Sequence, residues 1–228
     1  RPSRRRTCIR PSASAASVLT EDEMMLGVAV VDIGAGTTDV QIYTDGSVRH
    51  TAVIPIAGDM ITSDIAMALR TPTKDAEEIK VEYGVAKQLL ADPNEQLEVP
   101  GLGDRPPRML SRQALAGVIE PRIEEIYSLV HQVIRESGYE ELLSSGIVIT
   151  GGAAVMPGMI ELGEDIFLKP VRTGTPTYRG ALHDMVANPR SATVMGLLEE
   201  ARSARKRGPR VAQQAGAVNA LVGPAKAW

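Results

Sequence analysis

Val28-Ala-Val-Val-Asp-Ile-Gly-Ala-Gly-Thr-Thr-Asp39 is the segment that says most about the fold, because its pattern predicts a buried strand followed by a glycine-rich turn. Residues 26–33 form a continuous apolar run of strand length, which is typical of a strand covered on both faces. Residues 38–43 alternate in polarity, and Asp45-Gly46 favours a tight hairpin into a third strand over residues 47–56. We therefore expect a three-stranded β-meander.

Helices and a small hairpin are expected after the meander. Apolar residues recur at three- and four-residue spacing over residues 59–71, which predicts a helix that ends at Pro72. The same spacing predicts a second helix over residues 74–90. The Pro- and Gly-rich stretch that follows predicts turns, with short strands at 96–99 and 107–110.

The second half of the chain begins with a long helical segment after Ser111, in which Pro121 predicts a kink or a new helix start. Gly146-Ile-Val-Ile-Thr150 is another apolar strand. Pro157 suits the first turn of a helix that reaches Phe167.

A short strand around Val171 and a final helix over residues 189–207 complete the predicted body, so the fold class is mixed α/β. The chain contains no run of 18 apolar residues, which excludes a membrane-spanning helix. Cys8 is the single cysteine, so a disulfide framework is excluded. The three His residues (50, 131 and 183) are scattered without metal-ligand spacing.

The charges are unevenly distributed along the 228 residues. The formal net charge is −3, but all 28 acidic residues lie between Glu21 and Glu200, whereas Lys and Arg gather near both ends. A body this acidic repels nucleic acid, and only 3% of the residues are aromatic, so no nucleic-acid partner is expected. The basic ends would act as electrostatic tethers or remain solvated.

The turn in Asp32-Ile-Gly-Ala-Gly-Thr-Thr-Asp39 predicts a phosphate-binding loop, although a plain hairpin turn would explain Gly-Ala-Gly alone. Two glycines let the backbone approach a bulky anion, and exposed N–H groups can then surround phosphate oxygens. Asp32 ends the buried strand and is a candidate to face a magnesium ion through water. The candidate phosphate contacts are Gly34, Ala35, Gly36, Thr37 and Thr38.

A second glycine bend follows the strand that ends at Thr150. The sequence Gly151-Gly-Ala-Ala-Val-Met156 leads into a helix start, where a flat ring or a ribose can lie against bare backbone. Gly-Gly after a strand is often only a turn. The second bend is therefore a stronger indication of a binding site when it occurs together with the first bend than it is alone. The candidate contacts are Gly151, Gly152, Ala153 and Met156.

Glu77 and Lys80 form a third candidate element. At i and i+3 they share a helix face and could contact the hydroxyls and ring edge of a nucleoside. The alternative is a solvated ion pair, which contributes about 0.2–0.5 kcal/mol.

Together these segments resemble the actin, Hsp70 and sugar-kinase superfamily of ATP-binding folds, and within it the FtsA family of bacterial cell-division proteins. The first string is similar to the superfamily's second phosphate-binding hairpin, and Thr150-Gly-Gly-Ala-Ala154 is similar to its adenosine motif. The resemblance runs from about Ser17 to Gly208, and its most similar segments are residues 28–39, 55–66, 76–86 and 146–158.

The resemblance implies an actin-like (ribonuclease H-like) ATPase lobe that binds ATP and Mg²⁺ through Asp32, the two bends, Gly58 and Lys80. It implies a scaffold with at most weak ATPase activity, which forms filaments, contacts other divisome proteins and tethers the FtsZ ring to the cytoplasmic face of the inner membrane at the septum. The family's first lobe has no counterpart here, which suggests a fragment. A phosphotransferase of the sugar- or acetate-kinase type and a pilus-assembly actin homologue are the alternatives.

Four segments are expected along the chain. Residues 1–17 stand outside the fold as a disordered or foreign N-terminus, and residues 18–58 and 146–208 form two halves of one nucleotide-binding subdomain. Residues 59–145 form an outer subdomain, to which the resemblance assigns the C-terminal tail of FtsZ. Cations beside an apolar groove would suit that tail, although solvated arginines are the alternative for each candidate: Arg108, Arg112 and Arg122.

Residues 209–228 are expected to form a linker and a truncated membrane-targeting segment. An apolar stripe at helical spacing ends in a tryptophan suited to a bilayer interface. A disordered tail is the alternative, because Gly223-Pro224 interrupts the stripe. The candidate membrane contacts are Val218, Leu221, Val222 and Trp228.

Overall fold

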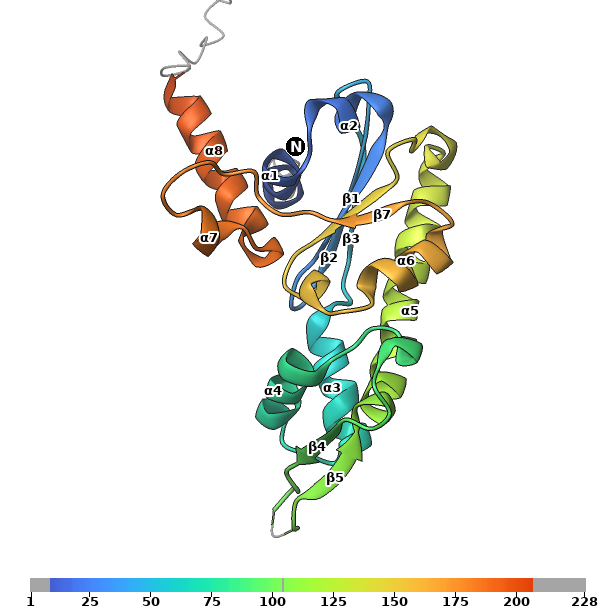
Figure 1. Ribbon diagram of the computed structural model, residues 1–228. Helices are drawn as coiled ribbons and strands as arrows, with labels where there is room; N and C mark the ends of the chain where they lie inside the picture. The colour runs from blue at the N-terminus through green and yellow to red at the C-terminus, as the bar shows by residue number, and fades with distance from the viewer. Residues whose placement is uncertain (1–8, 104, 207–228) are drawn as a thin grey trace, which may run out of the picture.

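The computed structural model describes residues 9–103 and 105–206, and its centre is a five-stranded mixed sheet (Figure 1). The strand order is β3-β2-β1-β6-β7. The first three strands are antiparallel, which confirms the predicted meander, whereas β6 lies parallel to β1 and β7 parallel to β6. The strands are β1 (Val28–Ile33), β2 (Thr38–Thr44), β3 (Ser47–Ile54), β6 (Ile147–Thr150) and β7 (Val171–Thr173).

The pairing of β1 with β6 brings distant parts of the chain to one edge of the sheet. Asp32 lies opposite Thr150 in this parallel ladder. Both strands therefore end at the same level, and both glycine bends leave the sheet side by side. The carboxyl end of neighbouring parallel strands is where α/β folds place ligands.

Helices cover both faces of the sheet, and the alternation of side chains along β1 separates the two layers. Ala29, Val31 and Ile33 pack in the cluster that contains residues of α5 (Arg112–Ser137) and α6 (Met159–Phe167). On the opposite face, Val28 and Val30 pack in a cluster that includes residues of α1 (Ile9–Val18) and α8 (Ala192–Lys206).

The expectation that residues 1–17 stand outside the fold is wrong for residues 9–17. They form most of helix α1, which lies against α8 (Figure 1). The two helices approach so closely that a Cβ atom added to Gly196 would come 1.7 Å from the carbonyl oxygen of Ala13. The small side chains that gave this stretch a disordered appearance are thus the ones that allow the close contact.

Helix α2 (Glu21–Leu26) joins α1 to the sheet. Thr20 and Glu23 form a capping box at its start, in which each side chain accepts a hydrogen bond from the other residue's backbone N–H. Glu23 also pairs with Arg172 on β7, with 2.7 Å between Oε1 and Nε. Burial alone would raise the pKa of Glu23, but the hydrogen bonds from Arg172 and Thr20 hold it below its ordinary value.

The outer subdomain lies beyond the end of the sheet at which the bends emerge (Figure 1). The long helix α5 runs from this subdomain up to the sheet and so joins the two parts. Besides the first half of α5, the outer subdomain contains α3 (Gly58–Leu69), α4 (Thr73–Tyr83), the 3-10 turn η1 (Gln88–Leu90), β4 (Gln96–Val99) and β5 (Arg108–Ser111).

Two predicted helices differ from the structure. Helix α4 ends at Tyr83 rather than at residue 90, because Gly84 turns the chain out of the helix and Ala86 N–H donates to the carbonyl of Pro157 at 2.8 Å. Helix α5 passes through Pro121 as one continuous element, so no new helix begins there.

The remaining elements are short. The helix expected to begin around Pro157 begins at Met159, after a 3-10 turn η3 (Ala153–Val155). The others are η2 (Glu140–Leu142), α7 (His183–Val186) and η4 (Pro189–Ser191). In the part of the chain that the structure describes, no helix has the length and apolar character needed to cross a bilayer.

Candidate functional site

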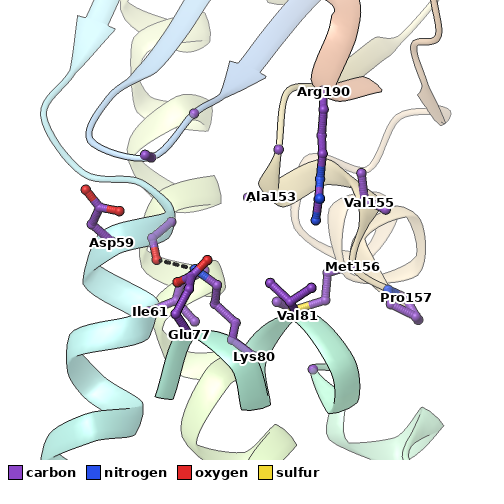
Figure 2. A pocket seen from close by; sticks show the side chains of 15 residues that line it. Asp59, Ile61, Glu77, Lys80, Val81, Ala153, Val155, Met156, Pro157 and Arg190 are labelled. Atoms are coloured by element: carbon purple, nitrogen blue, oxygen red, sulfur yellow. Dashed lines mark hydrogen bonds and ion pairs between the residues drawn. The ribbon is translucent and has the colours of Figure 1, made fainter. Parts of the chain in front are cut away.

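A pocket of about 280 Å³ lies between the end of the sheet and the outer subdomain (Figure 2). Gly34 and Ala35 of the first bend and Gly152, Ala153 and Met156 of the second all line it, so the two bends meet at one hollow. The other lining residues are Gly58, Asp59, Ile61, Glu77, Lys80, Val81, Gly84, Val155, Pro157 and Arg190.

The two bends are in direct contact. Gly151 has a φ of +93°, and a Cβ atom there would lie 2.5 Å from both the Asp32 Oδ1 atom and the Ile33 carbonyl oxygen. Only glycine satisfies this position, because it tolerates positive φ and leaves room for the neighbouring strand end. Gly151 does not line the pocket but shapes the bend that does.

The first bend is held by backbone hydrogen bonds. Gly34 N–H donates to the carbonyl of Thr37 at 3.0 Å, and Gly58 and Asp59 N–H groups donate to the carbonyls of Gly34 and Ala35 at 3.1 and 2.8 Å. The first turn of α3 therefore braces the loop. The N–H groups of Ala35 and Gly36 donate to no residue in the described ranges, so they remain available for an anion.

Three of the predicted phosphate contacts lie away from the pocket wall. Thr38 is fully buried in β2, and its hydroxyl donates to the carbonyl of Ile56 at 2.7 Å, so the expectation that this hydroxyl faces phosphate is wrong. Gly36 and Thr37 sit at the tip of the bend, outside the residues that line the pocket.

Glu77 and Lys80 belong to a hydrogen-bonded cluster in which the lysine is largely buried, so they are not a solvated ion pair. The Lys80 ammonium donates to the Gly58 carbonyl at 3.1 Å, to Thr62 Oγ1 at 2.7 Å and to Glu77 Oε2 at 2.6 Å. The lysine side chain is only 11% exposed, and its three donors all have acceptors. Lys80 therefore ties α3 and α4 together beneath the bend.

The protonation of Glu77 follows from this cluster. Burial alone would raise the pKa of Glu77, but hydrogen bonds from Lys80 and Thr62 and the positive charges of Lys80 and Arg190 lower it below its ordinary value. Glu77 is therefore a carboxylate near neutral pH. Because its side chain remains 49% exposed at the pocket wall, it is accessible to hydroxyl donors of a ligand.

Arg190 is the main pocket residue that sequence reasoning missed. It follows Asn188, whose Oδ1 accepts the Arg190 N–H at 3.0 Å, and its side chain points across the pocket toward Val81 (Figure 2). The Arg190 guanidinium donates no hydrogen bond to any described residue. No motif marks this position, since it reaches the pocket only through the turn η4 beside the second bend.

Asp32 does not line the pocket. Its Oδ2 atom accepts hydrogen bonds from the hydroxyls of Ser14 at 2.5 Å and Thr193 at 3.0 Å. The side chain shares its face of the sheet with Val28 and Val30, so it points toward α1 and α8. The prediction that Asp32 faces a magnesium ion through water stays a prediction.

The residues present are nevertheless compatible with magnesium. No group of three or more His, Cys, Asp or Glu side chains converges in residues 9–103 and 105–206, so the described chain offers no all-protein cage. Magnesium bound to a nucleotide needs only one or two carboxylates and keeps several waters. Asp32 already accepts two O–H donors, as it would accept metal-bound water, and Asp59 supplies a carboxylate on the pocket wall.

The three candidate arginines of the outer subdomain have internal partners. Arg122 binds both carboxylate oxygens of Asp64, at 2.5 and 3.0 Å, and Arg112 pairs with Glu95 at 2.7 Å. Arg108 donates to the carbonyl of Leu69 at 2.7 Å but has no carboxylate partner among the described residues. Of the three, Arg108 is the cation whose charge the described residues leave unpaired.

Comparison with known proteins identifies the family. The model of the family described as Cell division protein FtsA matches residues 29–196, which is well over half of the chain. This chain belongs to the FtsA family. That assignment places it with the cell-division proteins and not with the kinases or pilus-assembly proteins that share the fold.

Members of the FtsA family are similar along most of this chain. The cell division protein FtsA of Pseudomonas aeruginosa is 60% identical over 186 residues, which is 82% of this chain and 45% of that protein. FtsA of Escherichia coli K12 is 47% identical over 203 residues, covering 86% of this chain and 48% of that protein. The chain thus spans about half the length of the FtsA relatives it matches.

Solved structures confirm the actin-like fold. MreB5 of Spiroplasma citri bound to ADP superposes with a TM-score of 0.68 at 20% identity, covering 87% of this chain and 60% of that one. The MamK double helical filament superposes with a TM-score of 0.60 at 16% identity, covering 83% of this chain and 58% of that one.

The predicted membrane contacts Val218, Leu221, Val222 and Trp228 lie outside the described residues.

Proposed function

We propose that this chain is the nucleotide-binding part of an FtsA-type scaffold, and that the pocket between the sheet and the outer subdomain takes the nucleoside of ATP. The convergence of both glycine bends on one pocket carries the proposal. Ala35 and Gly36 present free N–H groups for phosphate oxygens, and Glu77 offers a carboxylate for ribose hydroxyls. Val81, Met156 and Pro157 supply an apolar wall for the base.

The partners follow as part of the same proposal. In the intact protein, ATP–Mg²⁺ would tune contacts in an actin-like filament, with little turnover. The outer subdomain would bind the C-terminal tail of FtsZ, and residues 209–228 would begin the segment that reaches the inner-membrane surface at the division septum. A neighbour of the same fold is described as a double helical filament, which supports self-assembly.

Binding of ATP tests the proposal directly. Titration of the 228-residue chain with a fluorescent ATP analogue should show saturable binding that unlabelled ATP competes away. A chain that folds, as judged by circular dichroism, and shows no binding at millimolar nucleotide would contradict the assignment of the pocket.

Replacing Arg190 by alanine should weaken the binding of adenosine, AMP, ADP and ATP by a similar factor of about 5–30, since a guanidinium stacked on a base contributes about 1–2 kcal/mol. The structural reason is the position of the side chain, which faces the apolar wall and not the first bend (Figure 2). Isothermal titration with the four ligands measures the factor. A loss that grows with each added phosphate would instead place Arg190 on the phosphates.

Replacing Arg108 by glutamate should weaken binding of an FtsZ C-terminal peptide about tenfold or more, because a cation without a carboxylate partner among the described residues would become an anion. Arg122→Lys is the matched control, since Asp64 would still hold the cation and little change is expected. Fluorescence anisotropy of a labelled peptide measures both. Equal affinities for the parent chain and Arg108→Glu would remove Arg108 from the proposed site.

A further inference from the structure

The Asp32 carboxylate joins three elements at a point just behind the pocket. It ends β1, and its Oδ2 atom accepts hydrogen bonds from Ser14 on α1 at 2.5 Å and from Thr193 on α8 at 3.0 Å. The two hydroxyl oxygens also lie 2.9 Å apart. Ser14 is fully buried and Asp32 is only 9% exposed, so this small network is shielded from bulk water.

The network is continuous with the wall of the pocket. The Asp32 Oδ1 atom lies against Gly151, and Gly151 N–H donates to the carbonyl of Pro189 at 3.3 Å. Pro189 begins the turn η4, which carries Arg190 into the pocket and continues directly into α8, where Thr193 lies. A movement of Asp32 would therefore change its contacts with α1, with α8 and with the second bend.

We infer that Asp32 is an exchangeable clasp: it holds α1 to α8 in the nucleotide-free state and exchanges its hydroxyl donors for magnesium-bound water when a magnesium–nucleotide complex binds. The inference rests on the proposed function. Its physical basis is competition, because the hydroxyls of Ser14 and Thr193 and the waters that magnesium retains are the same kind of O–H donor. One carboxylate oxygen at the bend cannot serve both sets fully.

The exchange loosens α1 without releasing it. The Ser17 hydroxyl, one turn further along α1, donates to the carbonyl of Ala192 at 2.8 Å and does not touch Asp32. Apolar contacts, including Ala15 and Val18, also remain. Nucleotide state would thus change how tightly the two helices are joined and leave the fold intact.

Removing the competing hydroxyls tests the clasp. We define the magnesium factor as the ratio of ATP affinity with magnesium to ATP affinity with EDTA. In the double variant Ser14→Ala/Thr193→Val this factor should increase about fivefold or more, because Asp32 no longer has to break two hydrogen bonds to accept magnesium-bound water. The matched control is Ser17→Ala, which removes a hydroxyl from the same helix and should leave this magnesium factor unchanged. If the double variant does not fold, Thr193→Val alone should give about a twofold increase.

Hydrogen exchange provides a second readout. Addition of ATP with magnesium should speed amide exchange in residues 13–18 of the parent chain and of Ser17→Ala, whereas ATP with EDTA should not. In the double variant, exchange in α1 should already be fast and should not respond to magnesium. ATP binding with an unchanged magnesium factor, or with α1 exchange insensitive to magnesium, overturns the clasp alone. Absence of ATP binding in every variant overturns the proposed function together with the clasp.

Discussion

Replacing Gly151 by alanine should destabilise the protein by about 2–4 kcal/mol, an effect of the size expected from backbone strain combined with a steric clash in a packed region. The new Cβ atom would lie 2.5 Å from the Asp32 Oδ1 atom and 2.5 Å from the carbonyl oxygen of Ile33. The φ of +93° adds strain for any side chain. Relief requires β1 and β6 to move apart at the point where both bends begin, so nucleotide binding should be lost as well. Chemical denaturation measures the free energy of unfolding.

Gly152→Ala is the control for this prediction. No heavy atom lies within 4 Å of a Cβ atom built on Gly152, and its φ of −65° is ordinary. Its free energy of unfolding should therefore stay within about 0.5 kcal/mol of the parent value. Because Gly152 lines the pocket, ATP affinity should still fall. Equal stability of Gly151→Ala and Gly152→Ala would show that the two bends do not touch as described.

Replacing Lys80 by methionine should lower ATP affinity about 100-fold and the free energy of unfolding by about 2–3 kcal/mol, since the half-exposed Glu77 carboxylate and two other acceptors lose their charged donor. The Gly58 carbonyl, Thr62 and Glu77 all accept from this ammonium. Without it, the first turn of α3 loses its brace, and the bend formed by Gly34 and Ala35 loses its support. The readouts are nucleotide titration and chemical denaturation.

Two controls separate the cluster from a simple ion pair. Lys74→Met removes an exposed lysine of the same helix, whose Nζ lies 3.6 Å from Glu78, and should change neither quantity. Glu77→Gln keeps an oxygen that can accept from Lys80 and Thr62, so its effect on stability should be smaller than that of Lys80→Met. If Lys80→Met binds ATP as tightly as the parent chain, Lys80 neither contacts the ligand nor positions the loop.

Local pattern predicted the strands and most of the helices. The apolar runs before Gly34 and Gly151 have the length and composition of buried strands. An apolar period of two distinguishes the meander from α3 and α5, where the period is 3.6. Helix α4 was predicted seven residues too long, because apolar spacing continues past Gly84. A tertiary hydrogen bond from Ala86 to Pro157 draws the chain away there.

Helix α1 was missed for a related reason. Its Ser- and Ala-rich sequence has little apolar periodicity, and nothing local shows that Gly196, far along the chain, leaves room for Ala13. Small residues are uninformative by themselves and become decisive only when a second helix lies against them. The close contact between α1 and α8 is therefore a property of the assembled fold.

The candidate site likewise combines features that are local in the sequence with features that arise only from packing. Glycine bends after apolar strands, and a Glu–Lys pair on one helix face, are local features that can be recognised in the sequence. Packing then combines these features into one site: the parallel register of β1 and β6 joins the bends, the close packing of α3 and α4 buries Lys80, and the turn η4 adds Arg190. Strand alternation turned Asp32 toward α1 and α8. A sequence specifies which groups a segment carries, but their hydrogen-bond partners come from other segments, such as Thr193 for Asp32 and Gly58 for Lys80, and only the packed fold brings those segments within reach.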